Sequence, residues 1–425
     1  MSARASTHCD RALVSALLSA RERREEGREA PRRYLGASVI GHPCERYLWL
    51  HFHGLLRERF DGRMLRLFDR GSREEAVFAE ELRWIGADVR PAAPDGSQWA
   101  VEAFGGHIRG HLDAAALLDG EWHVCEFKTH SDKSFRDLQR KGVEAAKPMH
   151  WAQMQIYMHL TGMERALYLA VDKDTDELYA ERVAHDAERA EGLMRRARAV
   201  VEGTASEPVS DRADDWRCRT CPAARLCFPA ADAFVLPSDC APDCRSCRHA
   251  SPDTDAPGAQ WRCALGLAMS IGEPTECRHH LPAPEAVPGA EWIDDDPPRL
   301  RMDGWEIIVS PEPGQYSGAE LARLPRGAVP AVDKAKAAFP GAEVKATRGL
   351  VETFVFDGYG AEAWEGEAER IPEALQALGI DPAAFRARET YKRIDATLYL
   401  GPEGVEHLVM YDPEKGRGRI MRARF

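Results

Sequence analysis

The sequence predicts an α/β or α+β protein that contains several folded parts. Three observations lead to this prediction. Helical patterns of apolar residues alternate with strand-like segments in the order helices, three strands, helix, strands. Eight of the eleven cysteines fall between residues 218 and 277, where apolar periodicity fades. A length of 425 residues favours two or three domains.

The elements of the first half follow from local patterns. Residues 1–33 form an amphipathic helix with a charged tail, and an aromatic-rich helix follows near Tyr47. The segment "RLFDRGSREEAVFAEELRW" has helical spacing and ends before Gly86, a residue that favours helix ends. Three strands are expected over residues 99–128: "WAVEAFGG", "IRGHLDAAALLDG" and "EWHVCEFKT".

The second half of this region is expected to continue with helices around a hairpin. The segment "HWAQMQIYMHLTG" predicts a helix ending at Gly162. "RALYLAVDKDTDELYAERV" predicts two strands joined by the turn "DKDTD", and an Arg/Glu-rich helix covers roughly residues 184–203.

Composition changes after Asp211, and we expect five segments in all. The last segment contains strand-like pieces, "GWEIIVS", "ETFVFDG", "ATLYLG" and "EHLVMYD", and no motif that we assign to chemistry. The expected segments are a helical lead-in (1–33), a main catalytic domain (34–235), a cysteine-rich unit (236–283), a Pro/Asp-rich linker (284–300) and a C-terminal α+β domain (301–425).

Bulk composition limits the function. The chain is 44% hydrophobic and 30% charged, and it lacks the run of roughly 20 apolar residues of a membrane helix. The N-terminus does not have the pattern of a signal peptide, so we expect a cytoplasmic protein. The net charge of −12 argues against a purely electrostatic nucleic-acid binder, but it allows an enzyme with a local basic groove and a metal ion.

A carboxylate–lysine group is the main chemical signal. Glu126 and Lys128 share one face of a strand because side chains alternate with period two, and Asp113 ends the preceding strand. Two carboxylates form a hard oxygen site for Mg²⁺ or Mn²⁺, and a nearby lysine can orient water or stabilise negative charge. Phosphodiester hydrolysis needs all three groups. The alternative is a surface hairpin whose charged side chains face water.

Three further residues favour the catalytic interpretation. Glu75 lies on the preceding helix, while Gln153 and Tyr157 lie one turn apart on the following helix. The set "GHLDA", "CEFKT" and "QMQIY" resembles the RecB-like branch of the PD-(D/E)xK nuclease superfamily over roughly residues 34–230. That resemblance implies a restriction-endonuclease-like mixed sheet flanked by helices.

The resemblance also implies roles for individual residues. It assigns Glu75 as the acid of the first helix, with the adjacent Glu74 as an alternative. Further roles implied by the resemblance are metal binding by Asp113, by Glu126 and by the backbone carbonyl of Cys125, catalysis by Lys128, and positioning of the DNA strand by Gln153 and Tyr157.

Two sets of cysteines suggest metal centres. Cys218, Cys221 and Cys227 form C-x2-C-x5-C, one thiolate short of a four-coordinate site, and Cys44 can supply the fourth. This layout is similar to RecB-like nucleases that hold a [4Fe–4S] cluster, including CRISPR-associated adaptation nucleases and AddB-type subunits. The alternatives are zinc bound by the same four thiolates and three unliganded cysteines in a loop.

The second set predicts structural zinc. Cys244 and Cys247 form a C-x2-C knuckle, and Cys263 and Cys277 follow at zinc-ribbon-like distances. The alternative is a cysteine-rich linker that does not fold. Four spare donors are available to replace one of the ligands: Cys240, His249, His279 and His280.

Together these features predict a Mg²⁺- or Mn²⁺-dependent DNA exonuclease that engages single-stranded DNA or a duplex end. We expect roles in recombination, repair, or phage or CRISPR DNA processing, with a helicase, annealing or adaptation protein as partner. The chain lacks a Walker A motif of its own. Two rival functions are a sequence- or structure-specific endonuclease of the same superfamily and a metal-stapled DNA-binding module with a degenerate site.

Overall fold

The computed structural model consists of two compact units, Met1–Val344 and Lys345–Phe425, which are described separately. The predicted strand "ETFVFDG" lies outside the described residues. The structure describes residues 10–26, 32–56, 60–204, 206–229, 243–272, 275, 277–287, 290–295, 298–302, 305–310, 315–321, 360–382, 385–391, 394–402, 405–413 and 415–423.

The first unit begins with three helices, α1 (Arg11–Glu26), α2 (Glu45–Phe52) and α3 (Gly62–Trp84). The side chain of Asp61 caps α3 by accepting a hydrogen bond of 2.7 Å from the backbone N–H of Met64. Helix α3 ends two residues before Gly86, whose φ of +90° confirms the expected helix-terminating turn.

A five-stranded mixed sheet forms the centre of this unit. Its strands lie in the order β2-β5-β6-β7-β8, and only the β6–β7 pair is parallel. The strands are β2 (Asp88–Arg90), β5 (Ala114–Leu118), β6 (Glu121–His130), β7 (Arg165–Asp172) and β8 (Leu178–Ala184). This is the mixed sheet flanked by helices that the sequence predicts.

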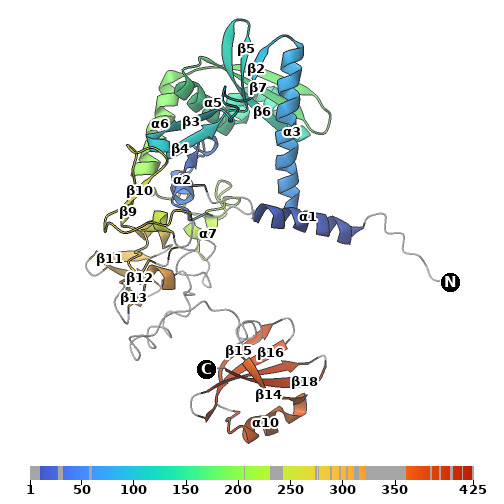
Figure 1. Cartoon of the computed structure of the whole chain (residues 1–425), viewed down its shortest axis with the longest axis vertical. Coiled ribbons are helices and arrows are strands. Elements are labelled where there is room, and N and C mark those ends of the chain that lie inside the picture. Colours follow the sequence, from blue (N-terminus) through green and yellow to red (C-terminus); the bar gives the residue numbers. More distant parts are fainter. Residues whose placement is uncertain are drawn as a thin grey trace, which may run out of the picture. The chain divides into compact units, whose positions relative to one another are not determined.

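Helices cover both faces of the sheet (Figure 1). On one face, Phe78 and Leu82 of α3 pack against Cys125 and Phe127 of β6. On the other, helices α4 (Asp132–Ala146) and α5 (Pro148–Thr161) contact β6 and β7, and α6 (Ala187–Glu202) packs on α5. Because β6 is covered on both faces, its polar side chains lie in the interior.

The structure corrects one predicted strand. The segment "IRGHLDAAALLDG" is two strands rather than one: β4 (Ile108–His111) and β5. Strand β4 belongs to a small sheet with β1 (Leu35–Gly36) and β3 (Ala100–Ala103). The chain changes sheets at Leu112 and Asp113 because the Asp113 carboxylate accepts a hydrogen bond from the Phe127 backbone N–H, so a side chain takes the place of the next ladder partner.

Helix α4 is an element that the sequence analysis did not predict. It starts at Ser131, immediately after β6, and contains Gly142 at φ +76°, which interrupts the helical geometry. The other predicted elements of this region are present, including α5 with Gly162 as a left-handed C-cap and the β7–β8 hairpin.

Trp261 is one of several residues that attach the cysteine-rich region to the rest of the first unit. Trp261 stacks on Phe52 of α2 with ring centroids 5.2 Å apart, and it meets the rings of His53 and His107 edge-on at 5.7 Å. The backbone carbonyl of Gln260 accepts a hydrogen bond of 2.9 Å from His107 Nε2. The region is therefore docked through aromatic stacking and a buried polar contact.

Little regular structure is found within the cysteine-rich region itself. A two-stranded ribbon, β9 (Ala250–Pro252) with β10 (Trp261–Cys263), follows a short turn, η3 (Cys244–Ser246). The stretch expected to be a linker is partly regular, because it contains η4 (Pro284–Ala286), β11 (Glu291–Asp295) and most of β12. Ala286 and Val287 are buried in the core of the first unit, which explains this difference.

Strand β12 spans Pro298–Met302 and pairs with β11 and with β13 (Trp305–Ile308).

The second unit is an antiparallel sheet in the order β14-β18-β17-β16-β15, with α10 (Ile371–Ala377) packed on one face. Its strands are β14 (Gly360–Glu367), β15 (Phe385–Tyr391), β16 (Ile394–Leu400), β17 (Glu406–Asp412) and β18 (Arg417–Ala423). Within the described parts of the chain, none of the helices combines the length and apolar character that a membrane crossing needs.

Candidate active site

Glu126 and Lys128 lie on the interior strand β6 rather than on a surface hairpin. The Glu126 side chain is 0% exposed, and the Lys128 side chain is 28% exposed. Lys128 Nζ forms an ion pair with Glu126 Oε1. On the neighbouring strand, Tyr168 is the register partner of Glu126. A buried carboxylate needs a compensating partner, so this pair is not a set of solvated surface charges.

Asp113 is held beside this pair by the break between β4 and β5. Its Oδ2 accepts a 2.7 Å hydrogen bond from the Phe127 backbone N–H and lies 3.8 Å from Lys128 Nζ. The register Ala114↔Cys125 places Asp113 opposite Glu126. Two carboxylates and one ammonium group from adjacent strands therefore meet at one place.

The first-helix acid comes from the middle of α3. The half-buried Glu75 interacts electrostatically with Asp113 and Lys128. Burial raises its pKa, and the charge of Asp113 raises it further. We therefore keep Glu75, rather than its neighbour Glu74, as the acid that belongs to this group.

The electrostatics of the group favour binding of a cation. Burial raises the pKa of Glu126 to about 7, and the negative charge of Asp113 opposes the lowering effect of Lys128. Among the described residues, neither Glu126 oxygen has a partner in hydrogen-bond geometry, although Lys128 lies within ion-pair distance. A divalent cation would satisfy these two buried oxygens, so the donor set fits a hard metal ion.

Gln153 and Tyr157 are buried, at 7% and 2% exposure, and contact each other. Gln153 Nε2 donates a 3.0 Å hydrogen bond to the Tyr157 hydroxyl, which donates a 2.9 Å bond to the His111 backbone carbonyl. A Cβ atom on Gly110 would lie 2.3 Å from Tyr157 Cε1, so the glycine allows the ring to approach β4. This pair therefore fixes the backbone at His111, two residues before Asp113.

A buried network next to Glu126 was missed by the sequence analysis. The hydroxyl of Tyr168 lies 2.8 Å from both His130 Nε2 and His150 Nδ1. Burial lowers the pKa of His130 to about 4 and that of His150 to about 3, and the charge of Lys128 contributes to both shifts. The network depends on the β6–β7 register, which sequence periodicity does not specify. The one available signal was the position of His150 one helical turn before Gln153.

The first cysteine set includes Cys44, which is the N-cap residue of helix α2. The four cysteines are free, and burial raises the thiol pKa of Cys218, Cys221 and Cys227. The Cys44 thiol raises each of the three further, so these side chains lie within electrostatic range of one another. Arg46 opposes the shift at Cys227 through its charge and a hydrogen bond.

Contacts between distant segments bring this first set together. Arg196 of α6 donates hydrogen bonds of 2.9 Å to the Ile40 carbonyl and 2.7 Å to the His42 carbonyl. Trp49 Nε1 donates a 3.0 Å bond to the Gly203 carbonyl. The segment that carries Cys44 is thus fixed to the helix that leads into the C-x2-C-x5-C segment.

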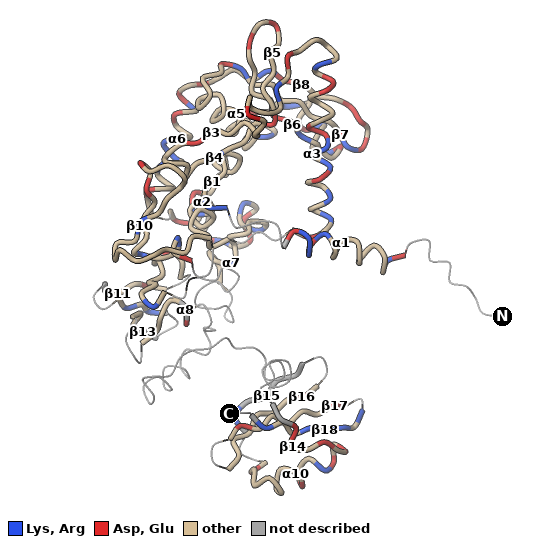
Figure 2. The backbone as a smooth tube through the Cα atoms, in the orientation of Figure 1, with Lys and Arg blue, Asp and Glu red and all other residues tan. Residues whose placement is uncertain are grey.

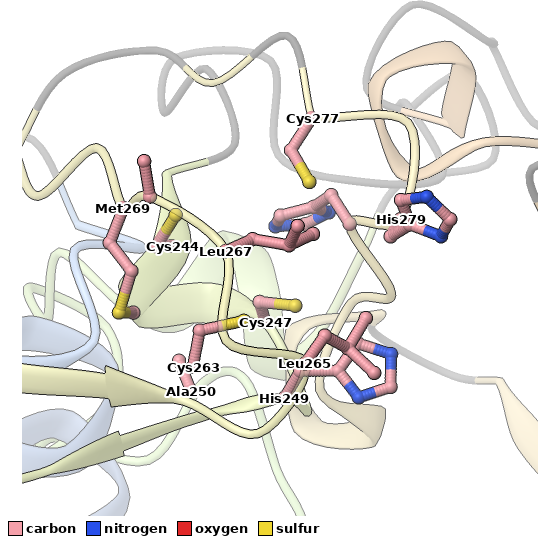
Figure 3. A pocket seen from close by; sticks show the side chains of 12 residues that line it. Cys244, Cys247, His249, Ala250, Cys263, Leu265, Leu267, Met269, Cys277 and His279 are labelled. Carbon is pink, nitrogen blue, oxygen red and sulfur yellow. The ribbon is translucent and has the colours of Figure 1, made fainter.

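The second cysteine set lines one cavity of about 20 Å³, which is room for a single water-sized sphere. Figure 3 shows the thiols of Cys244, Cys247, Cys263 and Cys277 around this cavity. Burial raises the thiol pKa of Cys244 and Cys247, and the nearby Cys277 thiol raises both further. Among the described residues, however, no three His, Cys, Asp or Glu side chains have the arrangement of a completed metal site.

The spare donors of the second set differ in their surroundings. His280 is buried, and its Nε2 lies 3.2 Å from the Asp243 carbonyl and 3.3 Å from Ser246 Oγ, so its ring already has partners. All three histidines, His249, His279 and His280, line the same cavity as the cysteines. Cys240 lies outside the described residues.

Comparison with protein-family models finds one match. The sequence model of the PD-(D/E)XK nuclease superfamily matches residues 11–228. No curated protein matches the chain.

Several solved structures match part of the chain at low similarity. The protein SSO0001 is 16% identical, with 51% of this chain and 96% of that chain covered and a TM-score of 0.31. LHK-Exo, an alkaline exonuclease from Laribacter hongkongensis, is 15% identical in its complex with dAMP, with coverage of 44% and 89% and a TM-score of 0.30. A phage-related exonuclease from Haemophilus somnus 129PT is 17% identical, with coverage of 31% and 68% and a TM-score of 0.25.

Proposed function

The chain belongs to the PD-(D/E)XK nuclease superfamily, and from this premise we propose that it is a metal-dependent DNA exonuclease. The observation that carries the proposal is the convergence of Asp113, Glu126 and Lys128 at the break between β4 and β5, with Lys128 Nζ within 4.0 Å of both carboxylates. Such a group suits hydrolysis of a phosphodiester bond.

We assign metal binding to Asp113, to Glu126 and to the backbone carbonyl of Cys125. A bound Mg²⁺ or Mn²⁺ would supply Lewis acidity and lower the pKa of a bound water. The Phe127 N–H fixes the Asp113 carboxylate, and among the described residues the buried Glu126 carboxylate has the Lys128 ammonium group as its charged partner. The protein therefore holds both carboxylates ready for a cation.

Lys128 is the residue that we assign to the attacking water and the developing negative charge. The two carboxylates raise its pKa despite its burial, so the side chain stays protonated. We assign Glu75 to the outer edge of the same site, where its carboxylate orients solvent or a second cation. Gln153 and Tyr157 position Asp113 through β4 rather than contact DNA, since both are buried.

We infer the exonuclease activity from the RecB-like motif set, because chains with this set mostly degrade DNA from an end. Single-stranded DNA or a duplex end is the proposed substrate, in recombination, repair, or phage or CRISPR DNA processing. A helicase, annealing or adaptation protein is the proposed partner. A site-specific endonuclease is the second candidate, and digestion of circular against linear DNA distinguishes the two.

We further propose that Cys44, Cys218, Cys221 and Cys227 hold a [4Fe–4S] cluster. The mutual electrostatic influence of these four thiols supports the assignment. The cluster would join the start of the nuclease domain to its end. Purified protein should absorb near 400 nm because of the cluster. A colourless protein with bound zinc would show that zinc, and not iron–sulfur, occupies this site.

The second set, Cys244, Cys247, Cys263 and Cys277, is proposed to bind structural zinc. The shared cavity supports this, and metal binding would supply folding energy that a region with three-residue strands lacks.

The deciding experiment measures degradation of linear DNA with Mn²⁺. We expect Asp113→Ala and Lys128→Ala each to lower the rate by at least about 100-fold, because each removes a charged group at the reacting centre. Glu121→Ala is the matched control, since Glu121 lies on the same strand with its side chain 64% exposed. Full activity in both site variants would refute the assignment, and inactivity of the wild-type chain would refute the function.

A further inference from the structure

Lysines from four separate segments gather at the end of β6. They are Lys128 on β6, Lys133 on α4, Lys147 between α4 and α5, and Lys173 after β7. After burial, the charges of Lys147, Lys128 and Lys173 are the main causes that lower the pKa of His130. The charges of three of these lysines therefore act on one buried ring, and Lys133 lies three residues beyond it.

Most charged residues near this point are paired. Arg136 pairs with Asp132 at 2.8 Å, and Arg140 pairs with Asp137 at 2.6 Å. Throughout the chain, Lys and Arg are interspersed with Asp and Glu (Figure 2). Against this background, unpaired cations at one place indicate a binding surface for anions.

The three outer lysines are not neutralised in this way. Within the parts of the chain that the structure describes, Lys133, Lys147 and Lys173 have no carboxylate within 4.0 Å. The acids of the adjoining turn have other partners. Asp172 accepts hydrogen bonds from the Asp174 N–H and from the Thr175 hydroxyl, and Asp174 accepts one from the Asp132 N–H.

Two of these lysines line an open cleft of about 770 Å³. Ser131 and Ser134 contribute hydroxyl groups to the same cleft. Its remaining lining is Asp132 and Asp137 with their partners Arg136 and Arg140, so the four cations of the cleft outnumber its two carboxylates. Lys147 Nζ donates a 2.7 Å hydrogen bond to Ser134 Oγ, which holds the ammonium group in the cleft. An ammonium group has three protons, so two remain for another acceptor.

The cleft is connected to the active site through buried groups. Ser134 Oγ lies 3.4 Å from His130 Nδ1, and His130 Nε2 lies 2.8 Å from the Tyr168 hydroxyl. Tyr168 is the register partner of Glu126. The hydrogen-bonded row Ser134–His130–Tyr168 thus runs from the cleft to the strand position beside Glu126, whose charge acts on the Tyr168 hydroxyl.

We propose that this cleft, with Lys133, Lys147 and the Ser134 hydroxyl, binds a backbone phosphate of the DNA strand that neighbours the one at Asp113, Glu126 and Lys128. The proposal rests on the proposed function. The cleft offers charge-assisted hydrogen bonds of the kind that bind phosphate. It contacts the backbone only, so it is expected to be indifferent to base sequence.

The test measures binding of a labelled single-stranded oligonucleotide by fluorescence anisotropy, with EDTA to prevent hydrolysis. Each lysine that binds a phosphate adds about 0.7 to the slope of log K against log salt. We expect the double variant Lys133→Gln/Lys147→Gln to lower this slope by about 1.4 and to weaken binding at low salt by about tenfold or more. Lys133→Arg/Lys147→Arg should keep the wild-type slope.

Lys141→Gln is the matched control, because Lys141 lies on the same helix but pairs with Asp137 at 3.0 Å. It should bind DNA with the wild-type slope. Wild-type DNA degradation together with an unchanged slope in the double Gln variant would overturn the phosphate site and leave the nuclease function intact. A wild-type chain that neither binds nor degrades DNA would overturn both. Circular dichroism confirms folding of each variant.

Discussion

The hydroxyl of Tyr157 joins helix α5 to β4 through two hydrogen bonds. Tyr157→Phe leaves the buried His111 carbonyl and Gln153 amide without this partner, so we expect the free energy of unfolding to fall by about 1–3 kcal/mol. Urea denaturation measures this change. Because the role is positioning, kcat should fall while KM stays close to wild type. An unchanged stability with a raised KM would indicate direct contact with DNA instead.

Two buried histidines and the partly buried His150 make the first unit sensitive to acid. Burial lowers the pKa of His53 and His150 to about 3 and that of His130 to about 4, whereas an unfolded histidine titrates near 6.5. Between about pH 6.5 and 4 the unfolded chain binds protons that the folded chain does not, so stability falls as the pH falls through this window.

The expected slope is about 1.4 kcal/mol per pH unit for each such histidine. Denaturant titrations at pH 7, 6 and 5 measure it. His53→Asn keeps a donor for the Trp49 carbonyl, which His53 Nδ1 contacts at 3.0 Å, and removes one titrating group. This variant should show a shallower slope than the wild type. An equal slope in both would show that His53 does not contribute.

At the scale of elements, alanine substitutions at two glycines are expected to have opposite effects on stability. Gly110→Ala brings a Cβ atom to 2.3 Å from the Tyr157 ring, so we expect a loss of about 1–3 kcal/mol in stability and a lower nuclease rate. Gly71→Ala on α3 adds a Cβ atom that has no atom within 4 Å, and it should gain up to about 1 kcal/mol because alanine favours helix. Thermal and urea unfolding of the pair measure both changes. Equal effects of the two substitutions would contradict the close contact at Gly110.

The elements also show which features of the fold could be predicted from the sequence and which could not. Alternation along β6 predicted that Glu126 and Lys128 share a face, because period two is a local property. The change of sheet at Asp113 depends on a hydrogen bond from Phe127, which is fourteen residues away and has no local signal. Helix α4 was missed because it is amphipathic but interrupted by Gly142. Its cleft and the Tyr168 network depend on how β6 and β7 pair.

At the scale of the whole molecule, the proposed zinc site can be tested. Cys247→Ser should lower bound zinc well below one ion per chain, measured by elemental analysis. It should also lower the melting temperature by at least about 4 °C, because zinc supplies folding energy to its surroundings. His279→Ala should retain the zinc, since four thiolates complete the site. If only the His279 variant lost zinc, His279 and not Cys247 would be assigned as a zinc ligand.

The docking of Trp261 has a consequence for synthesis of the chain. Phe52, His53 and His107 are translated early, yet the ring that covers them is the 261st residue. In the proposed cluster, Cys44 would likewise need ligands that are translated much later, at positions 218, 221 and 227. A ribosome-bound chain that already contains Asp113, Glu126 and Lys128 therefore still has an uncovered aromatic surface. Pulse-labelled nascent chains shorter than about 260 residues should be degraded rapidly by protease, and resistance should appear only in longer chains that also contain the core residues Ala286 and Val287.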